Sequence, residues 1–375
     1  MRAGCDLQAV TGPGATGLGV SVRLLLDALA AHATHIQLVG LRPNERDAPL
    51  RGVRDRLLWE QWRLPRRIRQ AHHAAPLDVF FSPALGAPLT CPVPLVVHVH
   101  DLIPLDEPAQ FHGASSWYWR SLLPATWSHA RLITVSNQSL VSEVAGRLPF
   151  PAERIRVVPY YADPRMAAAL AALPEHVQES PAGQPPLFLT LASHEPRKNI
   201  ELAIRAVTLL RAEGLIVQLK CIGAQTHHTE RLRRLAEHTG TADQVDFIGY
   251  AGTPQVAGLL ASCTALLFVS RREGYGMPPQ EAQSIGCPVV LSDIPSHRAV
   301  YDDPARWELV PPELRQPPPF VAPDDPMELA RLMRRLIEDG TYRDSLRLAG
   351  RAYQATFSAE ATARALATVL AEAAG

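Results

Sequence analysis

The feature that most restricts the fold of this chain is a repeated alternation of short apolar runs with longer amphipathic segments. The short runs have the length and the Val, Ile and Leu content of buried strands, whereas the longer ones have helical spacing. The expected strands are Ile36–Leu41, Val79–Ser82, Leu95–His100, Leu132–Ser136 and Ile155–Val158, then Leu187–Ala192, Val217–Ile222, Val245–Ile248, Ala265–Val269 and Pro288–Ser292. The expected helices are Val20–Ala31, Ser116–His129, Ile200–Ala212, Thr229–Glu237 and Pro254–Ala261. Such alternation indicates an α/β fold with doubly wound parallel sheets.

The two series of strands predict two domains joined by a linker. A length of 375 residues agrees with that number. Residues 174–186 contain four prolines and are typical of a linker between a first domain, 1–173, and a second, 187–345. A helical segment, 346–375, is expected to pack back toward the first domain, and the C-terminal helical pattern is expected to break at Gly340 and Gly350. Since doubly wound sheets bind ligands beyond the carboxyl ends of their strands, functional residues are expected just after strands, at a cleft between the domains.

Composition excludes several classes of protein. The 37 basic residues balance 37 acidic ones, which disfavours a general nucleic-acid binder. Five widely spaced cysteines without a C-x-x-C pair argue against a disulfide framework or a zinc site. The first nine residues lack a secretory pattern, so a cytoplasmic location is expected. All but two of the basic residues are arginines; the exceptions are Lys198 and Lys220.

The strongest local signal is the turn after the expected strand Ala265–Val269, which reads S-R-R-E-G-Y-G-M-P-P-Q-E-A. Gly274 and Gly276 allow left-handed backbone and a close approach to a ligand. The N–H groups of the following helix start attract an anion. Two carboxylates, Glu273 and Glu281, accept hydrogen bonds from hydroxyls instead. The combination suits a ligand that carries both phosphate and sugar hydroxyls.

A second candidate site follows the strand Leu187–Ala192 and reads E-P-R-K-N. Arg197 and Lys198 stand at a helix start, where cations oppose the helix dipole unless an anion binds there. The turn is therefore predicted to bind an anionic ligand. Lys220 has no comparable surroundings and is interpreted as structural.

Two further candidates lie in the first domain. His100 and Asp101 end the strand Leu95–His100, where the domain faces the expected cleft, and His98 is expected to point to the other side of the sheet. A histidine in such a place is, by itself, more often structural than catalytic. Gly17 and Gly19 belong to a glycine-rich helix start without the spacing of a dinucleotide fingerprint.

Taken in order, these motifs resemble a retaining glycosyltransferase of family 4, with the GT-B fold of two Rossmann-like domains facing a central cleft. The resemblance rests on the E-x7-E pair within E-G-Y-G-M-P-P-Q-E-A and on G-C-P-V-V-L-S-D from Gly286 to Asp293. It extends over almost the whole chain. The supporting segments are residues 17–19, 98–104, 134–136, 155–159, 195–199 and 247–250.

The resemblance implies roles for individual residues. It assigns Glu273 to hydroxyls of a donor sugar and Glu281 to the ribose of its nucleotide. Arg197 and Lys198 take the diphosphate, and His100 contacts the sugar near the reacting centre. The remaining donor-binding positions that it implies are Gly17, Gly19, Asp101, Gly249, Tyr250, Gly274, Tyr275, Gly276, Met277 and Pro278; Asp101 also serves to orient the His100 ring.

The activity implied by the resemblance is transfer of a sugar, with retained configuration, from a nucleotide-sugar to a hydroxyl of a glycan or lipid-linked acceptor. The donor is a co-substrate, GDP-mannose or a UDP-sugar, and no cofactor or metal is expected. A nucleotide-sugar epimerase, a phosphorylase of the same fold and a non-catalytic donor-binding subunit remain alternatives. The chain departs from many relatives at Tyr160 and Tyr161, where Asn-Gly is usual, and at Ala299, where an acidic residue is usual.

The stretch from Arg51 to Arg69 is rich in arginine and contains Trp59 and Trp62. A basic amphipathic helix with tryptophans can lie on an anionic membrane. A solvated helix that covers the acceptor side explains the pattern equally well. Contact with the inner face of a membrane is therefore one of two open interpretations.

Overall fold

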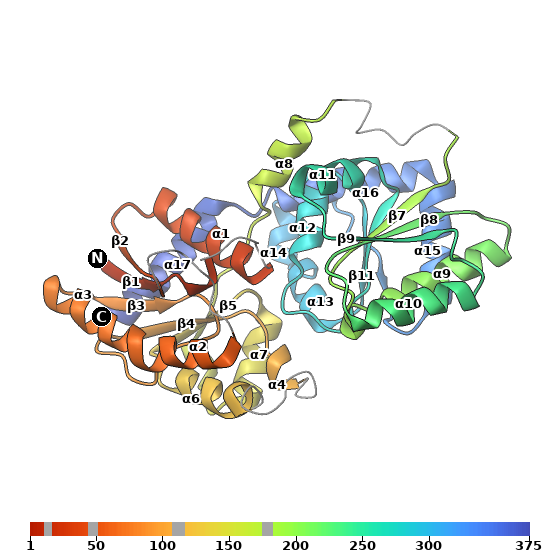
Figure 1. Ribbon diagram of the computed structural model, residues 1–375. Helices are drawn as coiled ribbons and strands as arrows, with labels where there is room; N and C mark the ends of the chain where they lie inside the picture. Colours follow the sequence, from red (N-terminus) through yellow and green to blue (C-terminus); the bar gives the residue numbers. More distant parts are fainter. Residues whose placement is uncertain (11–16, 44–51, 107–116, 175–182) are drawn as a thin grey trace. The chain divides into compact units, whose positions relative to one another are not determined.

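The computed structural model describes residues 1–10, 17–43, 52–106, 117–174 and 183–375. They form two compact units, each a parallel sheet covered by helices (Figure 1). Unit 1 comprises Met1–Tyr161 and Phe357–Gly375, and unit 2 comprises Ala162–Thr356. The chain thus leaves unit 1 earlier than the linker expected at 174–186, of which residues 175–182 lie outside the described part. Helix α8 (Pro164–Ala171) belongs to unit 2 because it packs against α11 (Thr253–Ser262).

The sheet of unit 1 has the strand order β2-β1-β3-β4-β5-β6, and all its pairs are parallel. The strands are β1 (Arg2–Asp6), β2 (Gln37–Leu41), β3 (Val79–Ser82), β4 (Leu95–Val99), β5 (Leu132–Val135) and β6 (Ile155–Val157). Five of them coincide with predicted strands. Strand β1, which lies between β2 and β3, was not predicted, because R-A-G-C-D lacks an apolar run although four of its residues are buried.

The helices of unit 1 bury large aromatic side chains, among them Trp59, Tyr118 and Trp127. They are α1 (Gly17–His32), α2 (Gly52–Leu58), α3 (Leu64–Ala74), α4 (Ile103–Asp106), α6 (Leu123–Ser128), α7 (Gln138–Arg147) and α17 (Ala359–Ala374), with π-helical turns η2 (Trp59–Arg63) and η4 (Tyr118–Leu122) and short 3-10 turns η1 (Gln8–Val10) and η5 (Ala152–Arg154). Figure 1 shows the C-terminal helix α17, in blue, beside α1, in red, and these two helices pack together. The C-terminal helix therefore completes unit 1.

The sheet of unit 2 has the order β12-β11-β10-β7-β8-β9 and is also parallel throughout. Its strands are β7 (Leu187–Leu191), β8 (Gln218–Ile222), β9 (Val245–Gly249), β10 (Ala265–Phe268), β11 (Val289–Ser292) and β12 (Phe320–Val321). The two-residue edge strand β12 lies in a proline-rich stretch, residues 311–323. The order places the carboxyl ends of β7 and β10 next to each other.

The remaining helices of unit 2 are the 3-10 turns η7 (Pro196–Lys198) and η8 (Pro312–Leu314) and the α-helices α9 (Ile200–Ala212), α10 (His227–His238), α12 (Met277–Ser284), α13 (Pro295–Tyr301), α14 (Pro304–Glu308), α15 (Pro326–Glu338) and α16 (Gly340–Gln354). A break at Gly340 is confirmed, but the break expected at Gly350 is wrong. Gly350 lies inside α16, and a Cβ atom there would come 3.0 Å from Cγ of Gln283 in α12. Because Gly350 has no side chain, α12 and α16 can approach each other closely.

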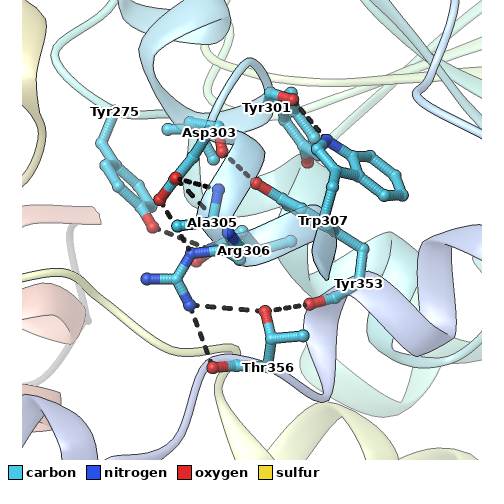
Figure 2. A network of polar contacts seen from close by, with 10 residues as sticks. Tyr275, Tyr301, Asp303, Ala305, Arg306, Trp307, Tyr353 and Thr356 are labelled. Carbon is cyan, nitrogen blue, oxygen red and sulfur yellow. Dashed lines mark hydrogen bonds and ion pairs between the residues drawn. The ribbon is translucent and has the colours of Figure 1, made fainter. Parts of the chain in front are cut away.

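A polar network holds the end of unit 2 (Figure 2). Asp303 caps α14 by accepting hydrogen bonds from the N–H groups of Ala305 and Arg306. The Arg306 guanidinium donates to the Thr356 carbonyl over 2.9 Å, and the Trp307 ring stacks on Tyr353. These contacts fix the segment from which the chain returns to unit 1.

Candidate functional site

The two turns that the sequence analysis singled out meet at the carboxyl ends of β7 and β10. Lys198 Nζ lies 2.6 Å from Glu273 Oε1, and Arg197 Nη1 lies 3.6 Å from Glu273 Oε2. Arg197 Nε also pairs with Glu195 over 2.9 Å. Two cations and two carboxylates, far apart in the sequence, therefore form one cluster. An anion was predicted to offset the charges of Arg197 and Lys198. In this structure, the carboxylates of Glu195 and Glu273 do so.

The Glu273 carboxylate is held in its charged form. Its side chain is only 8% exposed and that of Lys198 12%. Burial alone would raise the pKa of Glu273, but the charges of Lys198 and Arg197, with hydrogen bonds from Lys198 and Ser270, outweigh it. The pKa of Glu273 consequently lies below its ordinary value. Its carboxylate stays ready to accept hydrogen bonds from hydroxyls.

Asn199, for which no role was predicted, holds this cluster together. Its backbone is left-handed (φ 56°, ψ 36°), a conformation that asparagine tolerates better than most residues. Its side-chain amide donates to the carbonyls of Val269 (3.0 Å) and Pro323 (2.7 Å). The turn after β7 is thereby tied to the segments that follow β10 and β12, which brings Lys198 beside Glu273.

The start of α12 offers fewer backbone donors than predicted. Gly276 is the N-cap, with φ 97°, whereas Gly274 is not left-handed. The first four N–H groups of a helix lack intrahelical partners, but here Pro278 and Pro279 occupy two of those positions and have no N–H. The donors that remain belong to Gly276 and Met277. An anion bound here would rely on them and on nearby cations.

The Tyr275 side chain is part of a buried network and is not directed at the ion cluster. Its hydroxyl accepts a hydrogen bond from Gln280 over 2.8 Å, and its ring is only 6% exposed. Figure 2 shows the ring pointing toward Asp303 and Arg306. Tyr275 therefore supports the turn with its side chain, and only its backbone can serve a ligand near Glu273.

Glu281 lies in α12 and is partly exposed. Burial raises its pKa to about 7, the charge of Asp163 adds to this, and Arg165 opposes it. Asp163 caps α8 and pairs with Arg165. At neutral pH the Glu281 carboxyl is therefore divided between its acidic and ionised forms.

His297 is a second residue without a predicted role. Its Nδ1 lies 2.9 Å from the Ser292 carbonyl, which requires a proton on that nitrogen. Its Nε2 is buried and has no hydrogen-bond partner, and it would lie 3.5 Å from a Cβ atom at Gly276. Burial lowers the pKa of His297, although Glu273 favours the charged form. A Cβ atom at Gly276 would be in ordinary contact with this imidazole, and its tighter contact, 3.2 Å, would be with the Phe268 ring.

In unit 1, His100 follows β4 and both of its ring nitrogens have partners. Nε2 lies 2.7 Å from the Pro83 carbonyl, and Nδ1 lies 2.6 Å from the Tyr160 hydroxyl. The Asp101 carboxylate accepts from the N–H of Ile103, and its role in orienting the ring stays a prediction. Burial lowers the pKa of His100 to about 4, so the ring is neutral at pH 7.

The expectation that His98 points away from His100 is wrong. Side chains alternate along a strand, so residues two apart share a face. The two imidazole centroids are 4.5 Å apart, and His98 Nε2 lies 2.7 Å from the same Tyr160 hydroxyl. Tyr160, one of the departures from the family pattern, therefore bridges both histidines.

The other predicted positions lie at the start of α1 in unit 1 and at the end of β9 in unit 2. Gly17 begins α1 with open space around its Cα, and Gly19 is buried in the same helix. Gly249 ends β9 in a left-handed conformation, φ 81°, and Tyr250 after it is 79% exposed. The glycine loop at 11–16 lies outside the described residues.

A pair of buried carboxyls at the end of β1 has no predicted role. Asp6 accepts hydrogen bonds from Trp59 Nε1, and Glu60 accepts from Tyr118 over 2.6 Å. Burial raises the pKa of each to about 7, and the charge of Glu60 adds to the effect on Asp6. Glu60 also fills the space beside Gly86, where a Cβ atom would clash with its carboxylate.

Among the described residues, no group of three or more His, Cys, Asp or Glu side chains is arranged to hold a metal ion. Within the same residues, no helix combines the length and apolarity needed to span a bilayer.

Comparison with known proteins identifies the fold and then the family. A sucrose-phosphate synthase from Thermosynechococcus elongatus superimposes with a TM-score of 0.69 at 18% identity, over 99% of this chain and 98% of that one. HepE of Anabaena in complex with UDP-glucose gives a TM-score of 0.67 at 17% identity, over 99% of this chain and 100% of that one. The fold is therefore GT-B.

Two family models match adjoining parts of the chain. The model "Glycosyltransferase Family 4" matches residues 15–165, and "Glycosyl transferases group 1" matches residues 174–353. The chain belongs to the glycosyltransferases of family 4, as the sequence motifs indicated.

Curated relatives include serotype-specific mannosyltransferase WbdA of Escherichia coli, 30% identical over 69% of this chain and 31% of that protein. Another is alpha-1,3/1,6-mannosyltransferase ALG2 of Mus musculus, 27% identical over 51% of this chain and 47% of that protein. The matched regions thus span less than half the length of either relative.

Proposed function

We propose that this chain is a retaining glycosyltransferase that moves a sugar from a nucleotide-sugar to a hydroxyl of a glycan or lipid-linked acceptor. The observation that carries the proposal is the cluster of Lys198, Arg197 and Glu273 beside the glycine start of α12. It combines cations suited to a diphosphate with a carboxylate suited to sugar hydroxyls. Relatives described as mannosyltransferases favour GDP-mannose as the donor, with a UDP-sugar as the alternative.

The cluster suits both parts of such a donor. Lys198 has three N–H donors, so it can keep its bond to Glu273 while a second N–H binds a phosphate oxygen. Glu273 has lone pairs left for two sugar hydroxyls. Arg197 Nη1 is buried without a hydrogen-bond partner, and a phosphate oxygen would satisfy it. Glu281, in its ionised form, would accept from the ribose.

In the proposed reaction, the bond from the anomeric carbon to the diphosphate breaks while the acceptor oxygen bonds to the same face of that carbon. The acceptor proton passes to the departing phosphate, so atoms and charges balance. Lys198 and Arg197 stabilise the negative charge that develops on the leaving group. We propose that they do so without a metal ion; a chelator should then leave the rate unchanged, whereas a strict requirement for Mg²⁺ would contradict this.

A thermal-shift screen against GDP- and UDP-sugars tests donor binding. A donor at ~100 times its dissociation constant stabilises the folded chain by about 2.7 kcal/mol. Transfer to an acceptor, with the anomeric configuration of the product read by NMR, tests the reaction. An inverted product, or an epimerised or phosphorolysed one, would contradict the proposal, and a donor that binds without transfer would indicate a non-catalytic subunit.

We also propose that the enzyme acts in the cytoplasm at the inner face of a membrane and contacts it through unit 1. Trp62 is 76% exposed and Leu58 42%, and both belong to the basic stretch α2-η2-α3, whose Arg51 lies outside the described residues. Flotation with anionic liposomes at low salt should carry the chain upward, and Trp62→Ser should weaken this. A chain that stays with the soluble fraction would favour the solvated-helix interpretation.

A further inference from the structure

Five polar groups in unit 1 form one continuous chain of hydrogen bonds across four neighbouring strands. It runs from Thr134 in β5 to His98 in β4 (2.9 Å), then to Tyr160 after β6 (2.7 Å). From Tyr160 it continues to His100 after β4 (2.6 Å) and ends on the Pro83 carbonyl after β3 (2.7 Å). The two histidines are 8% exposed or less, and Tyr160 is 2% exposed, so water does not compete for these bonds.

The last acceptor fixes the direction of every bond. A carbonyl oxygen can only accept, so His100 carries a proton on Nε2, and in a neutral ring its Nδ1 must then accept. The Tyr160 hydroxyl therefore donates to His100 and accepts from Nε2–H of His98. His98 Nδ1 in turn accepts from the Thr134 hydroxyl. The Thr134 hydroxyl also lies 3.4 Å from the Val97 carbonyl, a longer contact than the 2.9 Å to His98. An extra proton on either ring would break the chain.

Burial lowers the pKa of both histidines, which agrees with two neutral rings. Without the phenol, His100 Nδ1 would lose its donor and His98 Nε2–H its acceptor. Nothing else in this set of contacts would then distinguish the two tautomers of His98.

We propose that Tyr160 is a positioning residue: its hydroxyl donates to Nδ1 of His100 and so holds the ring in the orientation in which its Nε2–H can donate to an oxygen of the bound ligand. In the free chain this N–H donates to Pro83. A ligand oxygen would exchange places with that carbonyl. The proposal depends on the proposed function only for the nature of the ligand, a nucleotide-sugar.

The tautomers can be read directly by ¹⁵N NMR of the histidine rings in the full chain, without any substrate. His98→Gln and His100→Gln variants assign the signals. We expect both rings of the natural chain to be neutral Nε2–H tautomers between pH 6 and 8. In Tyr160→Phe we expect His100 to keep its proton on Nε2, because the Pro83 carbonyl still accepts it, while its Nδ1 signal moves to that of a nitrogen without a hydrogen bond. His98 should populate both tautomers, because only the Thr134 hydroxyl, which can donate or accept, remains beside its ring nitrogens. Unchanged His98 and His100 spectra in Tyr160→Phe would overturn the proposal.

Tyr161→Phe is the matched control, because it removes a neighbouring buried hydroxyl that donates to the Leu24 carbonyl, outside this chain of bonds. It should leave both rings unchanged. If Tyr160→Phe does not fold, Thr134→Val tests the other end: Nε2 of His98 should keep its proton while its Nδ1 signal moves to that of a nitrogen without a hydrogen bond, and an unchanged Nδ1 signal would refute the hydrogen-bond chain.

Kinetics separate this proposal from the proposed function. With a donor identified by the thermal-shift screen, kcat/KM of Tyr160→Phe should fall about three- to tenfold, the loss of one neutral hydrogen bond. Tyr161→Phe should match the natural chain. If the natural chain transfers no sugar, the proposed function fails, whereas the NMR measurement still decides the role of Tyr160.

Discussion

Replacing Lys198 by methionine should destabilise unit 2, because it leaves Glu273 as a buried charge with only a distant partner. Lys198 Nζ is 2.6 Å from that carboxylate, and both side chains are nearly buried. Removing one member of such a pair costs about 3–5 kcal/mol. Arg197, at 3.6 Å, offsets part of the loss, so we expect about 3 kcal/mol. For a unit of this size that corresponds to a decrease in Tm of about 6–12 °C.

The dependence on pH gives the prediction a second readout. In the natural chain the pKa of Glu273 is lowered, so its ionisation stabilises the fold above about pH 4.5 and the benefit is lost as the pH falls through the folded pKa. In Lys198→Met, burial dominates and raises that pKa. The variant should then lose stability as the pH rises from about 4.5 toward 7. The difference from the natural chain should be larger at pH 8 than at pH 5.

A probe confined to unit 2 makes the measurement unambiguous. Trp307 is the only tryptophan between residues 162 and 356, so ¹⁹F NMR of chain labelled with 5-fluorotryptophan reports its unfolding separately. Lys220→Met is the matched control, since Lys220 is partly exposed and lies in register with Asp246 of β9; it should cost less than about 1 kcal/mol.

The double variant Lys198→Met/Glu273→Gln identifies the cause. It removes both charges, so most of the stability should return. If the double variant is as unstable as Lys198→Met, or if the single variant loses less than about 1 kcal/mol at pH 8, the charge argument is refuted.

Three further predictions concern other groups. The raised pKa values of Asp6 and Glu60, both about 7, mean that unit 1 should lose stability as the pH rises from about 4.5 to 7. In urea titrations, the free energy of unfolding of Glu60→Gln should depend less steeply on pH than that of the natural chain. An equal slope would contradict this. Because the pKa of Glu281 is about 7, donor binding measured by calorimetry should weaken as the pH falls from 8 to 6, and Glu281→Gln should abolish this dependence. Asn199→Ala should lower the free energy of unfolding, measured with a chemical denaturant, by about 2–3 kcal/mol, since it loses two buried hydrogen bonds and retains a left-handed backbone. A loss below about 1 kcal/mol would show that the turn keeps its conformation without the Asn199 side chain.

Most strands of both sheets could be predicted because their apolar runs, such as Val79–Ser82, are buried on both faces in a parallel sheet. Strand β1 was not predicted because its buried positions are filled by Ala3, Gly4 and Cys5. These small residues do not form the run of large apolar side chains that marks a buried strand. At Gly350 a helix break was predicted, but the residue lies inside α16. Glycine is typical of helix ends, but here it serves the contact between α12 and α16, which only the tertiary structure defines.

The meeting of Lys198 with Glu273 agrees with the rule that functional residues follow parallel strands. The order of the strands, with β10 beside β7, was not available from the sequence, so the ion pair itself was not predicted. Tyr160 was noticed only as a departure from the family. Its role depends on His98 and His100 sharing one face, which correct use of the strand period would have shown.

The division of unit 1 into two segments affects how the chain is made. Residues 162–356 leave the ribosome before Phe357–Gly375, so unit 2 can finish its sheet while α1 still lacks its partner α17. Domains usually fold in the order in which they are synthesised. Here the domain that begins first is completed after unit 2, and the surface of α1 that packs against α17 stays uncovered until Phe357–Gly375 has been synthesised.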